Sequence, residues 1–260
     1  MGTNLKFYKP NKINAAQSFS FTSASATLKQ YIFDDNRNTQ LISIGSDDIT
    51  DEEWIVTFGS SVTLDAIFVD NHNIKAGNIQ YSDDSQVSWK DFSSAIAWSG
   101  NSNTVDFFEF TQVSGITDLR LTMQTTIVVD AQKVVGQLRA LELIGEMVRN
   151  PSSYKITNVK AAARNKSQKG RLVKTTFGFS VMIRSTWNKI TATDMDLLES
   201  LDVDYESFYI YPCGGQSTYT ERGWRVRDLY LVSIDNDFSP DLNGNLLGIN
   251  ENIMLIFREA

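Results

Sequence analysis

The chain has 260 residues, of which 42% are hydrophobic and 21% are charged, a composition typical of one large globular domain or two ordinary ones. Its 31 acidic and 24 basic residues give a formal net charge of -7, which argues against a general nucleic-acid binder because such a surface repels polyanions. The single cysteine, Cys213, and the single histidine, His72, exclude disulfide frameworks, zinc sites built from Cys and His, and multi-histidine metal centres.

Short segments rich in β-branched and aromatic residues follow one another through the first half of the chain. The segments that suit strands are Trp54–Phe58, Ala66–Val69, Ala76–Tyr81, Thr104–Phe110, Asp118–Gln124 and Leu138–Ile144. Turn-forming residues at Gly59–Ser61, Ser82–Ser85 and Ser99–Asn103 separate them. This pattern predicts an antiparallel β-sandwich.

The large side chains of this half divide into buried and exposed candidates. Trp54 and Trp89 adjoin apolar strands, so we expect both to fill the core. Trp98 precedes a Ser-Gly-Asn turn and is expected to be exposed. His72 lies in a polar Asp-Asn-His-Asn stretch that indicates an exposed turn, so a catalytic role for it is not expected.

Charge is distributed unevenly and marks a domain boundary. Residues 34–146 hold 18 acidic and 6 basic residues, residues 147–193 hold 10 basic and no acidic ones, and residues 194–260 hold 13 acidic and 4 basic ones. The step near residue 147 is followed by Asn150–Ser153, a turn-rich linker. The sequence therefore predicts two domains, residues 1–148 and 151–260.

The second half combines strands with one helix. The expected strands are Lys155–Ala163, Leu172–Arg184, Ser207–Tyr211, Trp224–Ile234 and Asn252–Phe257. Thr193 can cap a short helix over Asp194–Leu201, in which Met195, Leu198 and Leu201 share one side. The fold class that these elements predict is mainly β, with an N-terminal sandwich and a small C-terminal α+β domain.

A run of features in the first half resembles the discoidin-like, or coagulation factor 5/8 C-type, domains. The matching segments are Phe33–Thr39, Glu53–Gly59, Thr63–Val69, Ile79–Asp84 with Trp89, Leu119–Leu121 and Ala140–Gly145. The resemblance implies a jelly-roll sandwich that recognises glycans, lipids or proteins through loops at one end and is not catalytic. It also implies that the ligand-binding loop tips carry Arg37, Asn38, His72, Asn73, Asn101 and Asn103.

Segments of the second half are similar to the closing domain of tail and baseplate proteins from tailed bacteriophages. These segments are Tyr209–Gly215, Arg222–Val232, Asp237–Pro240 and Ile253–Phe257. The resemblance implies a helix-bearing, β-barrel-like domain that repeats around a ring, fused to an accessory sandwich. The expected partners are sister subunits in a ring or trimer and other tail or baseplate proteins, with the protein made in the host cytoplasm and located in the virion tail.

Several kinds of chemistry lack the residues they need. The acidic residues Asp47–Asp48 and Asp51–Glu53 form an expected loop and not two carboxyls held across a cleft, as a glycosidase requires. The Asp241–Asn245 stretch fails the calcium-loop template because its glycine is misplaced. We expect no enzymatic activity, no cofactor and no metal site. The first ten residues hold no apolar stretch and no long apolar run occurs, so neither a signal peptide nor membrane insertion is expected.

The basic segment from Arg149 to Lys189 allows three interpretations. It could contact nucleic acid, such as DNA passing through a tail lumen, it could be a solvated positive face, or it could meet acidic surfaces of neighbouring copies. The third favours an assembly interface formed by Arg164, Lys166, Lys169 and Arg171. The expected function is then a structural component of a phage tail or baseplate whose sandwich is an adaptor or touches host glycan. The alternative is a stand-alone carbohydrate-binding module of a bacterial surface system.

Overall fold

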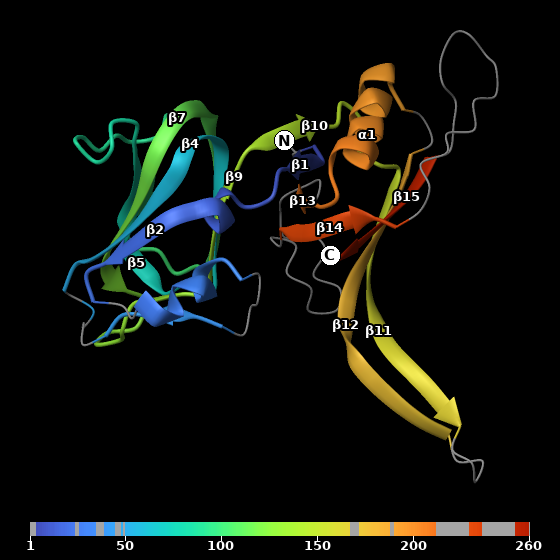
Figure 1. Cartoon of the computed structure of the whole chain (residues 1–260), viewed down its shortest axis with the longest axis horizontal. Helices are drawn as coiled ribbons and strands as arrows, with labels where there is room; N and C mark the ends of the chain where they lie inside the picture. Colours follow the sequence, from blue (N-terminus) through green and yellow to red (C-terminus); the bar gives the residue numbers. More distant parts are fainter. Residues whose placement is uncertain are drawn as a thin grey trace. The chain divides into compact units, whose positions relative to one another are not determined.

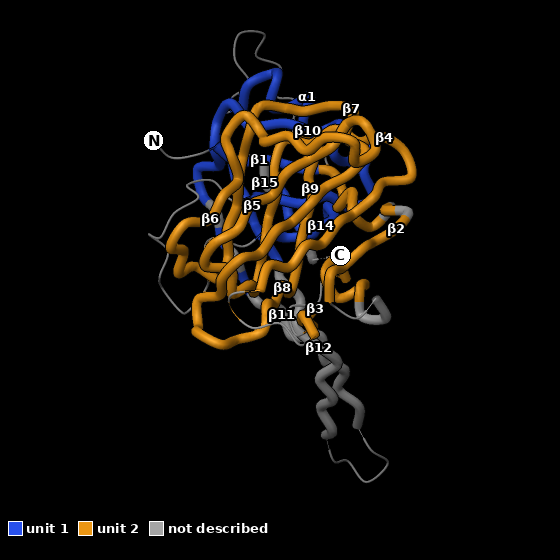
Figure 2. The backbone as a smooth tube through the Cα atoms, turned by 90° about the vertical axis from the view of Figure 1, so that its left-hand side faces the viewer, with its two compact units in different colours: residues 1–8, 144–260 blue, residues 9–143 orange. Residues whose placement is uncertain are grey.

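The computed structural model describes residues 4–23, 26–34, 39–44, 48, 50–166, 172–187, 190–211, 229–235 and 253–259. The chain is mainly β, as predicted, and its sheets are antiparallel. It divides into two compact units (Figure 2): residues 9–143 form one, and residues 1–8 together with 144–260 form the other.

Residues 9–143 form the sandwich. Its elements are η1 (Lys12–Ala15), β2 (Ala16–Phe21), η2 (Ala26–Ile32), β3 (Leu41–Ile42), β4 (Glu52–Asp70), β5 (Ile74–Ser82), β6 (Ile96–Trp98), β7 (Val105–Thr126), β8 (Val134–Val135) and β9 (Gln137–Leu141). The strands of the main sheet are ordered β2-β4-β7-β5-β6, with β9 also paired to β4, while β3 and β8 pair separately.

The two longest strands each replace a predicted pair of strands. Trp54–Phe58 and Ala66–Val69 both lie in β4, so the turn expected at Gly59–Ser61 is wrong. The β4–β7 register shifts between Thr57 and Ala66 instead. Such irregularities bend a strand without ending it, and the two halves of β4 therefore pair with different neighbours, β2 before the bend and β9 after it.

One hydrophobic core joins the halves of these strands. Trp54 of the first half of β4 and its register partner Leu121 of β7 share it with Ile67 and Val69 of the second half of β4 and Leu138 of β9. Trp54 is 1% exposed and its ring meets Phe21 edge to face at 5.7 Å, which confirms the core position predicted for it. Glu52, expected in an acidic loop, is instead the first residue of β4 and is buried.

The second unit contains β1 (Lys6–Tyr8), β10 (Leu143–Glu146), β11 (Ser153–Lys166), β12 (Leu172–Trp187), α1 (Ala192–Asp204), β13 (Phe208–Tyr211), β14 (Tyr230–Ile234) and β15 (Ile253–Glu259). Its strands form one sheet in the order β10-β1-β13-β14-β15-β12-β11. Among the described residues β10 and β11 do not pair with each other, so the sheet is open and the barrel-like expectation is wrong.

The division of the chain differs from the expected boundary at residues 148 and 151. Strand β1 pairs with β13, with Phe7 opposite Ile210, and β10 lies beside β1. The apolar side chain of Phe7 explains this placement, because it packs 5.6 Å from the ring of Phe208 in the second core. The first eight residues thus belong to the C-terminal unit.

Helix α1 is longer than predicted and begins earlier. Its N-cap is Thr191 and not Thr193, and the Thr191 hydroxyl accepts a hydrogen bond from the Asp194 amide at 3.1 Å. Met195, Leu198 and Leu201 are buried together, as their spacing predicts.

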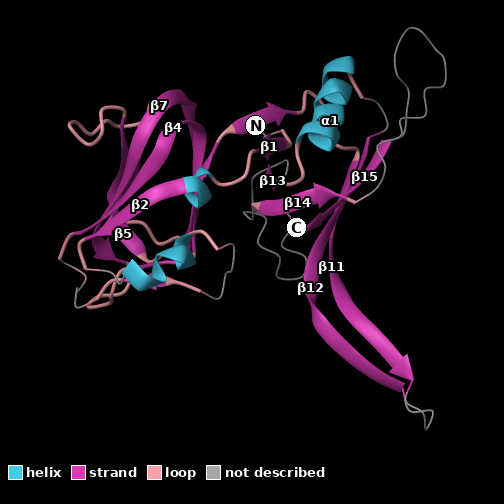
Figure 3. Cartoon of the chain, viewed as in Figure 1, coloured by secondary structure: helices cyan, strands magenta, loops and turns pink. Residues whose placement is uncertain are grey.

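A two-stranded ribbon extends from the sheet (Figures 1 and 3). Strands β11 and β12 pair from Ser153 with Thr186 to Lys166 with Leu172. Only Met182–Trp187 of β12 also pairs with β15. Within the described residues, the rest of the ribbon is therefore held by the pairing of its own two strands.

Candidate functional site

Four of the six predicted loop-tip residues lie at one end of the sandwich. His72 and Asn73 connect β4 to β5, and Asn101 and Asn103 connect β6 to β7. The backbone amide of His72 donates to Thr104 and that of Asn101 to Lys75, which ties the two connections together. The other two predicted residues, Arg37 and Asn38, lie outside the described residues.

The carboxylate of Asp106 is the centre of this end. It accepts hydrogen bonds from Trp98 Nε1 at 2.7 Å, Asn101 Nδ2 at 3.1 Å and Asn103 Nδ2 at 3.2 Å, and lies 3.0 Å from His72 Nε2. Burial favours the neutral carboxyl, but the bonds from His72 and Trp98 outweigh it and hold the pKa of Asp106 below its ordinary value. Sequence reasoning missed Asp106.

His72 is buried, so the exposed turn predicted for it is wrong. Its side chain is 0% exposed, and its Nδ1 accepts from the Ile74 amide at 3.2 Å. The Nδ1 acceptor requires the tautomer in which Nε2 carries the proton and donates to Asp106. Both ring nitrogens are thus occupied, which leaves none to act as a general base.

The exposed position predicted for Trp98 is also wrong. The side chain is 6% exposed, and its ring meets Phe108 edge to face at 5.4 Å. Trp89, by contrast, is half-buried and not a full core residue, with the Arg120 guanidinium 4.5 Å over its ring. Neither indole lies where the sequence placed it.

Asn73 connects this end to the loop before β8. Its Nδ2 donates to the Gln132 carbonyl at 2.7 Å and its Oδ1 accepts from the Val134 amide at 2.9 Å. The side chains of His72, Asn73 and Asn101 therefore hold loops in place. The ligand contact expected of the loop-tip residues stays a prediction.

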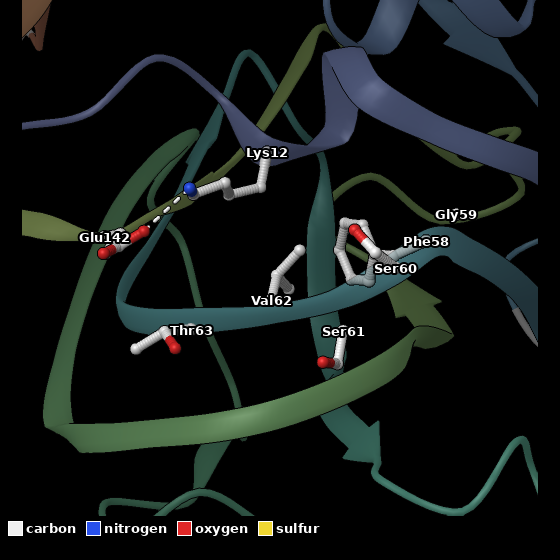
Figure 4. A pocket seen from close by; sticks show the side chains of 8 residues that line it. All are labelled: Lys12, Phe58, Gly59, Ser60, Ser61, Val62, Thr63 and Glu142. Atoms are coloured by element: carbon white, nitrogen blue, oxygen red, sulfur yellow. Dashed lines mark ion pairs between the residues drawn. The ribbon is translucent and has the colours of Figure 1, made fainter.

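A cavity of about 350 Å³ lies at the bend of β4 (Figure 4). Its walls are formed by Lys12 of η1, by Glu142 and by the segment from Phe58 to Thr63. The sequence predicted a turn at Gly59–Ser61 within that segment, and none of these residues was predicted to belong to a site. The only local signal was the Gly-Ser-Ser run inside an otherwise apolar stretch.

An ion-pair cluster closes one side of the cavity. Glu142 contacts Lys12 Nζ at 2.7 Å and Lys9 Nζ at 2.5 Å, each through a different carboxylate oxygen, and Figure 4 shows Lys12 and Glu142 pointing toward one another. Burial favours the neutral carboxyl of Glu142, but the hydrogen bonds from the two lysines outweigh it and lower its pKa. Glu142 is therefore ionised at neutral pH.

Hydroxyl groups line the rest of the cavity. Ser60 and Ser61 are exposed, and their hydroxyls have no hydrogen-bond partner among the described residues. The Thr63 hydroxyl donates to Ser114 at 3.1 Å, and the ring of Phe58 provides an apolar wall. Ligand pockets of this size combine apolar walls with a few convergent polar groups, and these groups suit a ligand rich in hydroxyls.

Two of the four predicted assembly residues lie in the described part of the ribbon. Arg164 and Lys166 are the last residues of β11, opposite Lys174 and Leu172, while Lys169 and Arg171 lie outside the described residues. In the described ranges, no three His, Cys, Asp or Glu side chains are grouped to hold a metal ion. No helix of the described chain has the length and apolar character to cross a membrane.

Comparison with known proteins gives likenesses of structure. No family model matches the sequence, and no curated protein matches it. The structure is similar to chitosan-binding module 1 from a chitosanase/glucanase of Paenibacillus sp. IK-5, at 16% identity and a TM-score of 0.43, over 51% of this chain and 98% of that one. It is also similar to a family 32 carbohydrate-binding module from Clostridium perfringens solved with galactose, at 16% identity and a TM-score of 0.41, over 53% and 99%. A further similar structure is a module from Clostridium perfringens in complex with GalNAc-β-1,3-galactose, at 13% identity and a TM-score of 0.42, over 52% and 99%.

Proposed function

We propose that residues 9–143 form a non-catalytic carbohydrate-binding module. The cavity at the bend of β4 carries this proposal, because it joins free hydroxyls at Ser60 and Ser61 to a charged pair and an aromatic wall. A sugar presents hydroxyls that both donate and accept hydrogen bonds, together with apolar faces of C–H groups. The resemblance of the sequence to discoidin-like domains supports the same function.

A glycan array probed with the full chain tests this function, followed by calorimetry with the sugar that binds best. Ser61→Trp places a bulky ring at the exposed rim of the cavity and should lower the affinity at least about tenfold, since one lost contact of about 1.4 kcal/mol already has that effect. Ser99→Trp is the matched control, because Ser99 is also exposed but follows β6 and does not line the cavity.

The two variants separate the cavity from the loop end. A loss of binding with Ser99→Trp and not with Ser61→Trp would assign the sugar to the loops that carry Asn101 and Asn103. Absence of binding to every glycan on the array, by a protein that retains its folded spectrum, would refute the carbohydrate function.

A second function is favoured by the β11–β12 ribbon. Such ribbons are marginally stable in water when nothing covers them, and this one carries a basic sequence inside an acidic protein. A structural subunit of a phage tail, baseplate or similar particle, with the sandwich as its glycan contact, would use the ribbon to meet another subunit. Size measurement of the purified chain distinguishes this subunit, which associates, from a stand-alone module, which stays a monomer.

A further inference from the structure

The β11–β12 ribbon brings like charges together. Lys155 and Arg184 are direct partners in the register, and both side chains are exposed. Farther along, Arg164 is the register partner of Lys174. Like charges opposite one another on neighbouring strands are destabilising, and residues 147–193 contain no acidic residue that could neutralise them.

Helix α1 in the same unit has the opposite charge. Its outer face carries Asp196, Glu199 and Asp202, three residues apart, and all three are exposed. Residues at this spacing are neighbours on a helix surface, so their charges repel. We call these three residues the anionic helix face.

The end of the helix adds to this repulsion. The last turn holds Asp202 and Asp204 and no basic residue. Anions near a helix C-terminus are unfavourable because the helix dipole is negative there. Within the described residues, no ion pair joins the anionic helix face to any cation, including Lys155 and Arg184 of the ribbon.

Both surfaces therefore carry uncompensated charge of opposite sign on one chain. We propose that copies of this protein associate head to tail, with the β11–β12 ribbon of one copy lying against the anionic helix face of the next. An interface between two different surfaces of identical subunits is heterologous, and it builds rings or filaments depending on the rotation between subunits. The contact would also cover the part of the ribbon beyond Met182, which within the described residues is held only by the pairing of its own two strands.

A nucleic acid is the other polyanion that the ribbon could meet. The formal net charge of -7 opposes it over the whole molecule, whereas the anionic helix face supplies a matching surface on every copy. The inference deepens the structural role proposed for the C-terminal unit and is independent of glycan binding by the sandwich.

Charge reversal of each surface in the full chain tests the inference. The ribbon variant is Lys155→Glu/Arg164→Glu/Lys174→Glu, and the helix variant is Asp196→Lys/Glu199→Lys/Asp202→Lys. Sedimentation velocity should show that the wild-type chain associates at low ionic strength and less at high ionic strength, because salt screens exposed charges. Each variant alone should need a protein concentration at least about tenfold higher to associate.

Mixing the two variants gives the decisive result. The reversed ribbon of one variant then meets the reversed helix face of the other, and the unreversed ribbon meets the unreversed helix face, so opposite charges face each other at both contacts. An equimolar mixture should therefore associate at a concentration at which neither variant associates alone. The control Asp91→Lys/Asp130→Lys reverses two exposed charges of the sandwich and should associate like the wild type. Unchanged thermal midpoints of all variants show that folding is intact.

Three outcomes would overturn the inference. The first is a wild-type chain that stays monomeric at low ionic strength. The second is a mixture of variants that remains as dissociated as its components. The third is a monomeric wild-type chain that binds a DNA duplex, together with a ribbon variant that no longer binds it. Glycan binding measured on the same proteins is a separate readout, since its failure would leave the mixing result unchanged.

Discussion

The Asp106 side chain holds together the β4–β5 and β6–β7 connections at one end of the sandwich. Three side chains from two connections and the indole of Trp98 at the end of β6 reach its carboxylate, and the histidine among them is fully buried. Hydrogen bonds to a charged acceptor are stronger than neutral ones, so the loop end of the sandwich depends on this carboxylate more than on any of its donors. The consequence can be measured as stability.

Asp106→Asn should lower the free energy of unfolding by about 2 to 3 kcal/mol, because it turns one acceptor oxygen into a donor that faces other donors. Urea denaturation followed by fluorescence measures this. Asp130→Asn is the control, since Asp130 is exposed and its replacement should change stability by less than about 0.5 kcal/mol. Equal midpoints for the two variants would show that Asp106 does not hold the loops together.

The lowered pKa of Asp106 also predicts a dependence on pH. Its pKa in the folded protein lies below the reference value of 3.8, so the unfolded chain takes up this proton first as the pH falls. The stabilisation is present in full above about pH 5 and is lost progressively as the pH falls through the folded pKa. Wild type should lose stability more steeply than Asp106→Asn below about pH 4, and parallel curves would contradict the assignment.

The sequence misplaced His72 because its surroundings along the chain are polar. The partner that buries it, Asp106, is 34 residues away, and no local pattern announces such a pair. Trp54 was predicted correctly because its position in an alternating apolar strand determines its burial locally. The cavity residues were not predicted because their partners, like those of His72, are far apart in the sequence. Lys12 and Glu142 come together only when the sandwich folds.

At the scale of elements, helix α1 depends on one buried carboxylate. Asp194 is 0% exposed, and it accepts hydrogen bonds from the Val148 amide at 2.6 Å and the Thr191 hydroxyl at 2.7 Å. The same side chain thus fixes the first turn of the helix and the chain that follows β10. The predicted helix began at Asp194 itself, because Thr193 offered an equally good capping residue in the sequence.

Removing these contacts should have graded effects. Thr191→Ala deletes the cap and should cost about 1 kcal/mol. Asp194→Ala should cost about 3 kcal/mol, because it also leaves the Val148 amide without its acceptor. Asp196→Ala, on the exposed side of the helix, is the control and should change stability by less than about 0.5 kcal/mol. Thermal unfolding measures all three, and an equal cost for Thr191→Ala and Asp194→Ala would show that the buried contacts contribute nothing.

The strands were predicted in type but not in number. Val, Ile and Phe alternation identified the apolar halves of β4 and β7, whereas the polar residues between them resembled turns. Gly59, Ser60 and Ser61 remain within β4 because register shifts against β7 absorb the bend. Local composition cannot distinguish a bend of this kind from a turn, since both favour small polar residues.

For the whole molecule, the charge step near residue 147 located the boundary only approximately. Composition could not reveal that β1, at the start of the chain, lies between β10 and β13 in the second sheet. Phe7 is fully buried there beside Phe208 and Phe257. A pairing between strands so far apart in the chain gives no local signal in the sequence other than the short apolar pattern of β1 itself.

Dividing the chain at the observed boundary should therefore give unequal pieces. Residues 9–143 contain their whole core and should unfold cooperatively alone, with a thermal midpoint near that of the sandwich in the full chain. Residues 144–260 lack β1, and the loss of Phe7 alone is equivalent to a core truncation of about 3 to 5 kcal/mol, so this piece should not fold stably.

The missing strand can be returned in a way that isolates its contribution. Lys9 and Glu142 pair through their backbones at 2.9 Å, as do Met147 and Leu5, so β1 and β10 run antiparallel and a short Asn-Gly turn can join Tyr8 directly to Leu143. A chain of residues 1–8, this turn and residues 143–260 should recover cooperative thermal unfolding by circular dichroism, and Phe7→Ala in it should abolish the recovery. Stable folding of residues 144–260 without β1 would show that the N-terminal strand is an attachment to the sheet and not a part of its core.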